Sequence, residues 1–297
     1  MKRIFFILLS ACLLIGCAEE SIQPPSLILE GWIEADGYPV VLIHKSYVLD
    51  AAKDSSQTLE EIAEQQLIPF GKVTVSDGEN EVILTGRLDT AYMPPYTYSS
   101  LDMVGQVGKT YTVTAKYRSF YATATTTIPP IAYLDSVVVH SSVNDKVNIR
   151  AFMSGIDPNK NTYYALFVKQ IDDKQYQLCP FGVFESKDAT DGQLEITIFN
   201  PFPNPDKPRL SHYFFNDTTK SVQQREYDLK LATIDYASYQ FWKAYNELII
   251  TQGILFVPVY KNIPSNIEGG YGYFSGMSSS FYHFNLSRTT TYRYSHP

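Results

Sequence analysis

The sequence lacks the short motifs that mark most catalytic and metal sites. Its three cysteines and five histidines show neither the Cys-x-x-Cys nor the His-Glu-x-x-His spacing of zinc sites. No serine lies in the Gly-x-Ser-x-Gly pattern of a hydrolase elbow, and no phosphate-binding loop occurs. A stretch from Asp157 begins like a calcium loop, but Thr162 replaces the required glycine and Val168 the required glutamate. We therefore expect no catalytic residues, no metal and no cofactor. A zinc site or a carboxylate pair assembled from distant residues stays open.

Basic residues are scarce and never form a block. The 31 acidic residues outnumber the 24 basic ones, which gives a formal net charge of −7. An acidic surface repels the phosphate backbone, so nucleic acid is not an expected partner. Only the first apolar run of the chain stands out, and no later run is long enough to span a bilayer.

That apolar run lies at the start of the chain and has the form of a signal peptide. A basic pair, Lys2-Arg3, precedes residues 4–15, which are apolar but too few for a transmembrane helix. Leu14-Ile15-Gly16-Cys17 then resembles the bacterial lipobox. The resemblance implies removal of residues 1–16, a diacylglycerol thioether on Cys17, and a further acyl chain such as palmitate on its amine. Two or three chains hold a protein stably on a membrane. A plain secretory signal is the alternative.

Two acidic residues follow the lipobox cysteine. Glu19 and Glu20 resemble the surface-export signal of Bacteroidota lipoproteins, which implies the outer face of the outer membrane. The alternative is a solvated acidic tether, and residues 17–25 form a lipidated tether in either case. With Cys17 acylated, Cys179 has no disulfide partner, and we expect it to be a small buried apolar residue.

The composition favours a mainly β fold. The 23 tyrosines and 17 phenylalanines, together with frequent Thr and Val, suit strands. Residues 27–34 alternate between apolar and polar side chains, and hairpin turns are predicted around Asp36-Gly37 and Asp77-Gly78. Two long alternating strands, 109–117 and 121–128, are joined at Arg118-Ser119. We expect an N-terminal immunoglobulin-like antiparallel β-sandwich over residues 26–130.

Residues 131–297 are expected to form a second β-rich domain with one packed α-helix. The helix is predicted at about 237–251, capped by Asp235 or Ser238, with an apolar stripe that contains Phe241 and Tyr245. Trp242 lies beside this stripe, either at the core edge or as an exposed partner contact. A capping box at residues 58–61 predicts a shorter helix, to about Gln66, in the first domain. Strands are expected at 134–140, 147–153, 161–171, 175–183, 194–199, 210–215 and 226–234.

Several short patterns resemble a known family in this order along the chain. They are Leu29-Glu30-Gly31-Trp32-Ile33, Gly105-x-x-Gly108-x-x-Tyr111, Tyr121-x-Ala-x-Thr, Ile128-Pro129 with Asp135-Ser136, and Ser265 to Phe274. Together they look like the Bacteroidota lipoproteins of the domain-of-unknown-function-4249 family. The resemblance implies an outer-membrane lipoprotein, often encoded beside a TonB-dependent receptor. It implies no activity.

Aromatic residues in two loops are candidate contacts for a partner or ligand. They are Tyr92, Tyr96 and Tyr98 in a proline-rich loop, and Tyr271, Tyr273 and Phe274 among glycines. Loop aromatics supply contact area at a low entropic cost. The alternative is that these rings cover the edges of the core.

The sequence thus favours a non-enzymatic, surface-exposed outer-membrane lipoprotein, accessory to a TonB-dependent receptor in nutrient uptake. The alternative is a stand-alone glycan- or peptide-binding lipoprotein. A hydrolase with scattered carboxylates is the least favoured of the three.

Overall fold

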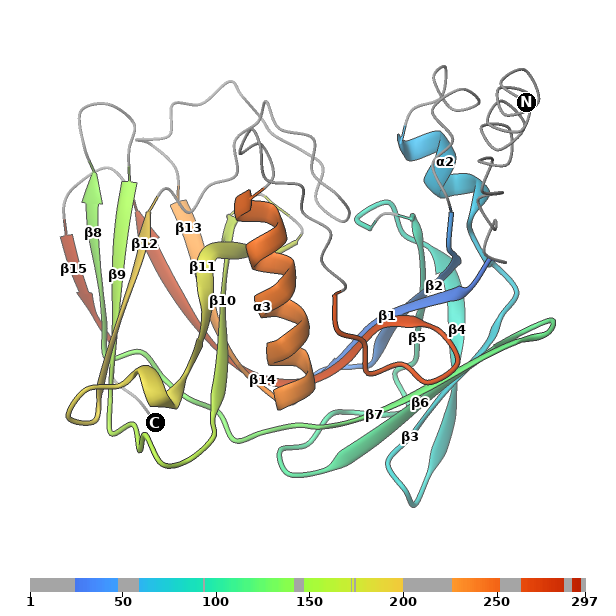
Figure 1. Ribbon diagram of the computed structural model, residues 1–297, viewed down its shortest axis with the longest axis horizontal. Coiled ribbons are helices and arrows are strands. Elements are labelled where there is room, and N and C mark those ends of the chain that lie inside the picture. The colour runs from blue at the N-terminus through green and yellow to red at the C-terminus, as the bar shows by residue number, and fades with distance from the viewer. Residues whose placement is uncertain are drawn as a thin grey trace, which may run out of the picture.

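The computed structural model is mainly β, as the composition predicts (Figure 1). It describes residues 25–47, 59–92, 94–141, 147–171, 173, 175–199, 226–251, 263–285 and 290–294. The strand expected at 210–215 lies outside these ranges. Among the described residues, no helix is both long and apolar enough to cross a bilayer.

Within the described residues, the N-terminal half of the chain contributes seven strands and one short helix. The strands are β1 (Leu27–Glu34), β2 (Val40–Lys45), β3 (Lys72–Ser76), β4 (Glu81–Leu88), β5 (Tyr96–Ser99), β6 (Thr110–Tyr117) and β7 (Phe120–Thr127), and the helix is α2 (Leu59–Gln65). Both predicted hairpin turns form, with positive φ at Asp36 and Gly78. The alternation predicted for β1 is confirmed, because every second side chain from Leu27 is buried.

The described part of the C-terminal half adds eight strands, a 3₁₀ turn and the long helix. They are β8 (Ser136–Ser141), β9 (Val147–Ser154), β10 (Tyr163–Gln170), β11 (Gln177–Glu185), η1 (Ser186–Asp188), β12 (Gln193–Phe199), β13 (Glu226–Ile234), α3 (Tyr236–Thr251), β14 (Tyr271–Asn285) and β15 (Thr290–Arg293). Asp235 accepts a hydrogen bond from the Ser238 backbone N–H at 2.8 Å, so Asp235 caps α3.

The fifteen strands found in the described ranges form two sheets. Eleven run in the order β11-β10-β13-β14-β1-β2-β5-β4-β3-β6-β7, and four in the order β12-β9-β8-β15. The mainly β class is confirmed, but the immunoglobulin-like sandwich expected at 26–130 is not. The strands of that range all belong to the larger sheet, which curls so that Thr123 of β7 bridges to Glu268 just before β14.

Strand β14 joins the two halves of the molecule. Its first half pairs in parallel with β1, and its second half pairs antiparallel with β13, with Met277 in both ladders. The larger sheet therefore contains strands from both sides of residue 130, where the sequence suggests a domain boundary. Figure 1 shows β14 passing from one half to the other beneath α3.

Glycines make this junction sterically feasible. A Cβ on Gly272, which has a φ of +118°, would lie 1.9 Å from the Leu29 carbonyl oxygen. A Cβ on Gly269, at φ +80°, would lie 2.3 Å from the Tyr121 carbonyl oxygen. The glycine-rich stretch before Phe274 thus lets β14 approach both β1 and β7 more closely than any other residue would permit.

Three hydrophobic clusters stabilise this arrangement. One fills the curled sheet of β1–β7 and includes Phe274. A second lies between the four-stranded sheet and the β10–β11–β13–β14 region, and it contains Cys179 and Phe284. The third lies on the opposite face of that region, under α3, around Trp242 and Phe167. Trp242 is 8% exposed, so its side chain belongs to the edge of the core and is not an exposed contact for a partner.

Candidate functional site

The expected membrane anchor lies outside the described residues. Cys17, Glu19 and Glu20 fall in residues 1–24, which the structure does not describe. Their roles as lipid attachment point and export signal therefore stay predictions from the sequence.

Two of the candidate loop tyrosines bind their own chain. Tyr98 is 2% exposed; its hydroxyl donates to the Ile68 carbonyl and accepts from the Gly71 N–H at 2.9 Å. The half-buried Tyr96 donates to the Pro69 carbonyl at 2.9 Å. Burial raises the pKa of Tyr98. Both side chains fasten the segment before β3 to β5, which is a structural role.

Tyr92 is positioned between the two halves of the molecule. Its ring lies 5.8 Å from that of Trp32 on β1, centroid to centroid. Its hydroxyl shares a hydrogen bond with the Gln175 side chain, just before β11. Burial is the main cause of the raised pKa of Tyr92. The half-buried ring therefore links the loop before β5 to the C-terminal half.

The glycine-flanked aromatics separate into three environments. Phe274 is fully buried inside the curled sheet, and Tyr273, at 6% exposed, packs under α3 with its ring 4.4 Å from that of Phe241. Tyr271 is 60% exposed. Of these three, only Tyr271 offers its ring to a partner in this structure. The alternation of a strand explains why Tyr273 and Phe274 point to opposite faces. Tyr271 shares the face of Tyr273 but lies at the very start of β14.

An ion pair adds a further link between the two halves. The Lys230 ammonium on β13 lies 2.9 Å from each carboxylate oxygen of Glu34 on β1. It also lies 5.7 Å from the centroid of the Tyr176 ring. Burial, and then the nearby carboxylates of Asp228 and Glu34, raise the pKa of Tyr176. The Lys230–Glu34 pair therefore links β13 to β1 by opposite charges.

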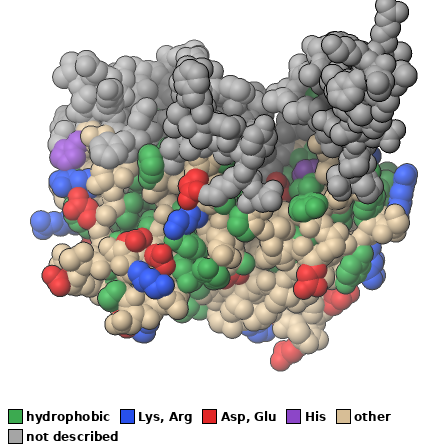
Figure 2. All heavy atoms as spheres, in the orientation of Figure 1, with side chains coloured by type: hydrophobic (Ala, Val, Ile, Leu, Met, Phe, Trp, Pro, Cys, Tyr) green, Lys and Arg blue, Asp and Glu red, His purple; other side chains and the backbone are tan. Residues whose placement is uncertain are grey.

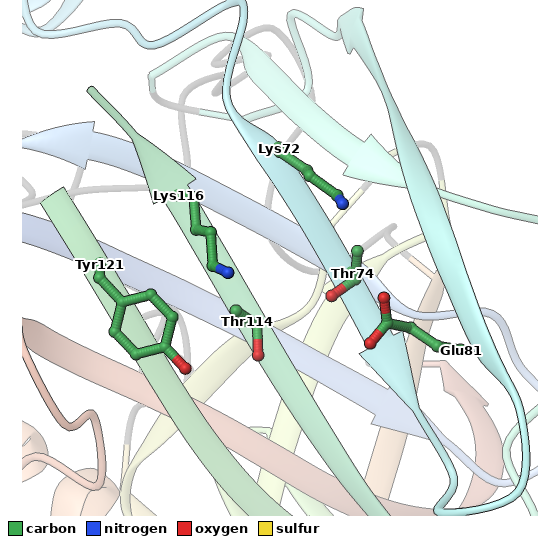
Figure 3. A pocket seen from close by; sticks show the side chains of 6 residues that line it. All are labelled: Lys72, Thr74, Glu81, Thr114, Lys116 and Tyr121. Atoms are coloured by element: carbon green, nitrogen blue, oxygen red, sulfur yellow. The ribbon is translucent and has the colours of Figure 1, made fainter. Parts of the chain in front are cut away.

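The described residues contain a polar hollow, on the outer face of the curled sheet. Its volume is about 250 Å³, and Figure 3 shows the side chains that line it, which are Lys72, Thr74, Glu81, Thr114, Lys116 and Tyr121. These residues come from β3, β4, β6 and β7. The register of β3 with β6 places Thr74 opposite Thr114 and Lys72 opposite Lys116. On its other side, Lys116 lies opposite Tyr121 of β7.

The hollow arises from a difference in side-chain length. Thr74 and Thr114 are short and form its floor, whereas the longer lysine, glutamate and tyrosine side chains stand around them (Figure 3). Thr74 is only 5% exposed although it belongs to the outer face. A neighbouring pair, Thr112 on β6 and Thr125 on β7, is joined by a 3.1 Å contact between hydroxyls.

Most polar groups of the hollow make no interaction with the rest of the described chain. No hydrogen bond or ion pair there involves the side chains of Lys72, Glu81, Thr74 or Thr114. The Lys116 ammonium lies 5.3 Å from the centroid of the Tyr121 ring. The hollow therefore has ammonium, carboxylate and hydroxyl groups available for a ligand.

The sequence alone did not point to this site. The polar alternation of 72–76 and 110–116 is visible in the sequence, but it reads as an ordinary solvated strand face. Only the register of β3 with β6 shows that two lysines and two threonines form opposite pairs.

The remaining candidate chemistry gives no second site among the residues that the structure describes. Within the described ranges, no group of three or more His, Cys, Asp and Glu side chains is placed to hold a metal ion. Cys179 is buried, as expected, and burial raises the pKa of its thiol. Asp157 accepts hydrogen bonds from the backbone and side chain of Asn159, which makes this segment a turn.

Comparison with known proteins assigns the chain to a family. No curated protein matches the sequence. The model of one family, described as "Domain of unknown function (DUF4249)", matches residues 18–282, which include every strand from β1 to β13, helix α3 and most of β14. The chain belongs to this DUF4249 family.

Proposed function

We propose that this protein is a lipid-anchored lipoprotein of the outer membrane, displayed at the cell surface, and a non-enzymatic accessory to a TonB-dependent receptor in nutrient uptake. The observation that carries the proposal is Leu14-Ile15-Gly16-Cys17 followed by Glu19-Glu20. The family match supports it, because it begins at residue 18, directly after the cysteine that would carry the lipid. The short segment between Cys17 and β1 suits a tether that holds the folded part close to the membrane.

The proposal is tested by purifying the full-length protein from its native membrane in mild detergent and identifying the proteins that accompany it by mass spectrometry. We expect a stoichiometric TonB-dependent receptor. The matched control is Cys17→Ser, which removes the lipidated sulfur and should release the protein from the membrane fraction. Recovery of the lipidated protein without any receptor would overturn the accessory role.

Surface display has its own test. Intact cells are treated with protease, and loss of the protein is compared between the wild type and a Glu19→Ala/Glu20→Ala variant. We expect the wild type to be digested and the variant to be protected, because the acidic pair directs export. Protection of the wild-type protein would overturn the surface location.

One structural observation favours a second candidate, a stand-alone glycan- or peptide-binding lipoprotein. The hollow over β3, β6 and β7 presents polar groups without partners in the described chain. Recovery of the protein alone in the detergent experiment would favour this candidate.

A further inference from the structure

We infer that the hollow formed by Lys72, Lys116, Thr74, Thr114, Glu81 and Tyr121 is a binding site for an acidic saccharide, a sugar that carries a carboxylate. The site does not depend on the proposed receptor partnership, because it lies within this chain alone. Its chemistry follows from the groups that line it.

The two lysines indicate that the ligand carries a negative charge. Lys72 and Lys116 are directly opposite each other on neighbouring antiparallel strands, where Cβ atoms are about 5 Å apart and like charges destabilise the pair. No acidic side chain of the described residues forms an ion pair with either lysine. A carboxylate bound between the two ammonium groups would relieve this repulsion and accept charge-assisted hydrogen bonds from both.

The floor of the hollow indicates that the ligand carries hydroxyl groups. The Thr74 and Thr114 hydroxyls lie side by side in the register, and neither makes a hydrogen bond within the described chain. Figure 3 shows the Glu81 carboxylate turned toward Thr74 from the adjoining strand. Hydroxyls that donate and accept, together with a carboxylate that only accepts, match the hydroxyl groups of a sugar.

Tyr121 completes the site with an aromatic surface. Its side chain is 49% exposed and borders the hollow beside Lys116. An exposed tyrosine offers an apolar face with a polar tip, which suits the alternating C–H and hydroxyl groups of a pyranose ring. A volume of about 250 Å³ corresponds to a small ligand or one unit of a chain, rather than to a whole polymer.

The same groups disfavour a polyanion such as nucleic acid. Glu81 places a negative charge at the edge of the hollow, and the chain as a whole carries a net charge of −7. Both would repel a ligand with closely spaced phosphates. Two ammonium groups facing one carboxylate, with hydroxyl partners around them, fit a ligand with one charge per sugar unit.

Calorimetric titration of the detergent-solubilised, full-length lipoprotein with a short oligogalacturonate tests the inference. The neutral comparison is the fully methyl-esterified oligosaccharide of the same length, which keeps the hydroxyls and loses the charge. We expect the acid to bind and the ester to bind at least tenfold more weakly. Added salt should weaken binding of the acid, since exposed charges are screened.

The matched variants are Lys72→Gln/Lys116→Gln and Lys160→Gln. Lys160 is exposed in the connection between β9 and β10, so its replacement changes the charge far from the hollow. We expect the double variant to lose at least tenfold in affinity and Lys160→Gln to bind as the wild type does. The double variant should also have a thermal midpoint no lower than the wild type, because it removes a like-charge pair. That result would show that any loss of binding is not loss of fold.

Three results would overturn the inference. The first is equal binding of the acid and its methyl ester, and the second is binding of the acid that survives replacement of both lysines. The third is a complete absence of binding by the wild type. None of these results bears on co-purification with a receptor, so the two proposals fail separately.

Discussion

Two parts of the larger sheet present their outer faces to different surroundings. Over β10, β13 and β14 the face carries large aromatic side chains, and α3 covers it with Tyr239 and Trp242. Over β3, β6 and β7 the face carries threonines and lysines and holds the hollow. The same sheet thus uses one outer face for packing and leaves the other available for recognition.

The difference follows from side-chain size and polarity. Aromatic rings that alternate along a strand need a cover, because an exposed apolar patch of that size is unfavourable in water. Threonines need no cover, since their hydroxyls are hydrated or pair across strands, as Thr110 does with Thr127 at 2.8 Å. In the orientation of Figure 2, acidic and basic side chains are spread over the described surface, several of them next to a side chain of opposite charge, which is typical of a solvated exterior.

The largest effect is expected from a substitution that disrupts the junction between the two regions. Gly272→Ala would place a methyl group 1.9 Å from the Leu29 carbonyl oxygen at a φ of +118°. We expect the free energy of unfolding to fall by more than about 4 kcal/mol, because both the clash and the backbone conformation oppose the alanine. Thermal unfolding followed by circular dichroism measures the effect.

The matched control is Gly78→Ala in the turn between β3 and β4. Gly78 also has a positive φ, +90°, but a Cβ there would meet no atom within 4 Å. We expect a loss of about 1 kcal/mol, the cost of the backbone conformation alone. Equal losses at Gly78 and Gly272 would contradict the close approach of β14 to β1.

A second experiment compares an aromatic residue of the covering helix with one on the open face. Trp242, on α3, is 8% exposed, and its ring packs edge-on against Phe167 of the covered face at 5.5 Å between centroids. Trp242→Ala should lower the free energy of unfolding by about 3–5 kcal/mol through lost burial and a residual cavity. Tyr121→Ala on the open face should change it by no more than about 0.5 kcal/mol.

Guanidinium titrations of both variants measure these values. A loss for Tyr121→Ala as large as that for Trp242→Ala would mean that the open face is packed against another part of the chain. That outcome would remove the contrast between the covered and the open face.

The smallest expected effect concerns the turn at the end of the open face. Asp77 accepts hydrogen bonds from the Asn80 and Glu79 N–H groups and lies 2.9 Å from the Lys109 ammonium. The Asn80 hydrogen bond, first, and then Lys109 lower the pKa of Asp77 from 3.8 to about 2. Since the folded pKa lies below the unfolded one, this stabilisation is present above pH 3.8 and is lost as the pH falls toward 2.

Lys109→Met tests how much of the lowering of the Asp77 pKa comes from Lys109 and how much from the backbone hydrogen bonds. We expect the pKa of Asp77 to rise but to stay below 3.8, because the backbone hydrogen bonds of the turn remain. A carboxyl-detected NMR titration follows Asp77 directly, and Lys72→Met is the control that should leave it unchanged. A pKa that returns fully to 3.8 would show that the turn amides do not stabilise the carboxylate.

Local patterns predicted individual elements well. The helix expected at 237–251 spans Tyr236–Thr251 and is capped by Asp235, one of the two residues suggested. The two-residue connection at Arg118-Ser119 also forms, with a positive φ at Arg118. Such features depend on neighbours within a few residues, so their signals are contained in the sequence itself.

The same local reasoning did not predict which distant strands pair with each other. The glycine-rich stretch from Gly269 to Gly276 gives no alternation of apolar and polar side chains, yet it begins the longest strand of the sheet. Its partners, β1 and β7, lie more than 140 residues away along the chain. No local pattern specifies which distant strand a segment joins, and this choice decided whether residues 26–130 formed a sandwich of their own.

The sequence by itself determined the mainly β class, the cap of α3, the two hairpin turns, the burial of Cys179 and the prediction of a lipid anchor at Cys17, because each depends on composition or on adjacent residues. Tertiary structure alone decided that Tyr96 and Tyr98 fasten a neighbouring segment, and that α3 covers Tyr273 whereas the curled sheet encloses Phe274. It also decided that Lys72 meets Lys116 across β3 and β6. The physical reason is that the identity of a neighbouring strand, and its register, set which side chains share a surface.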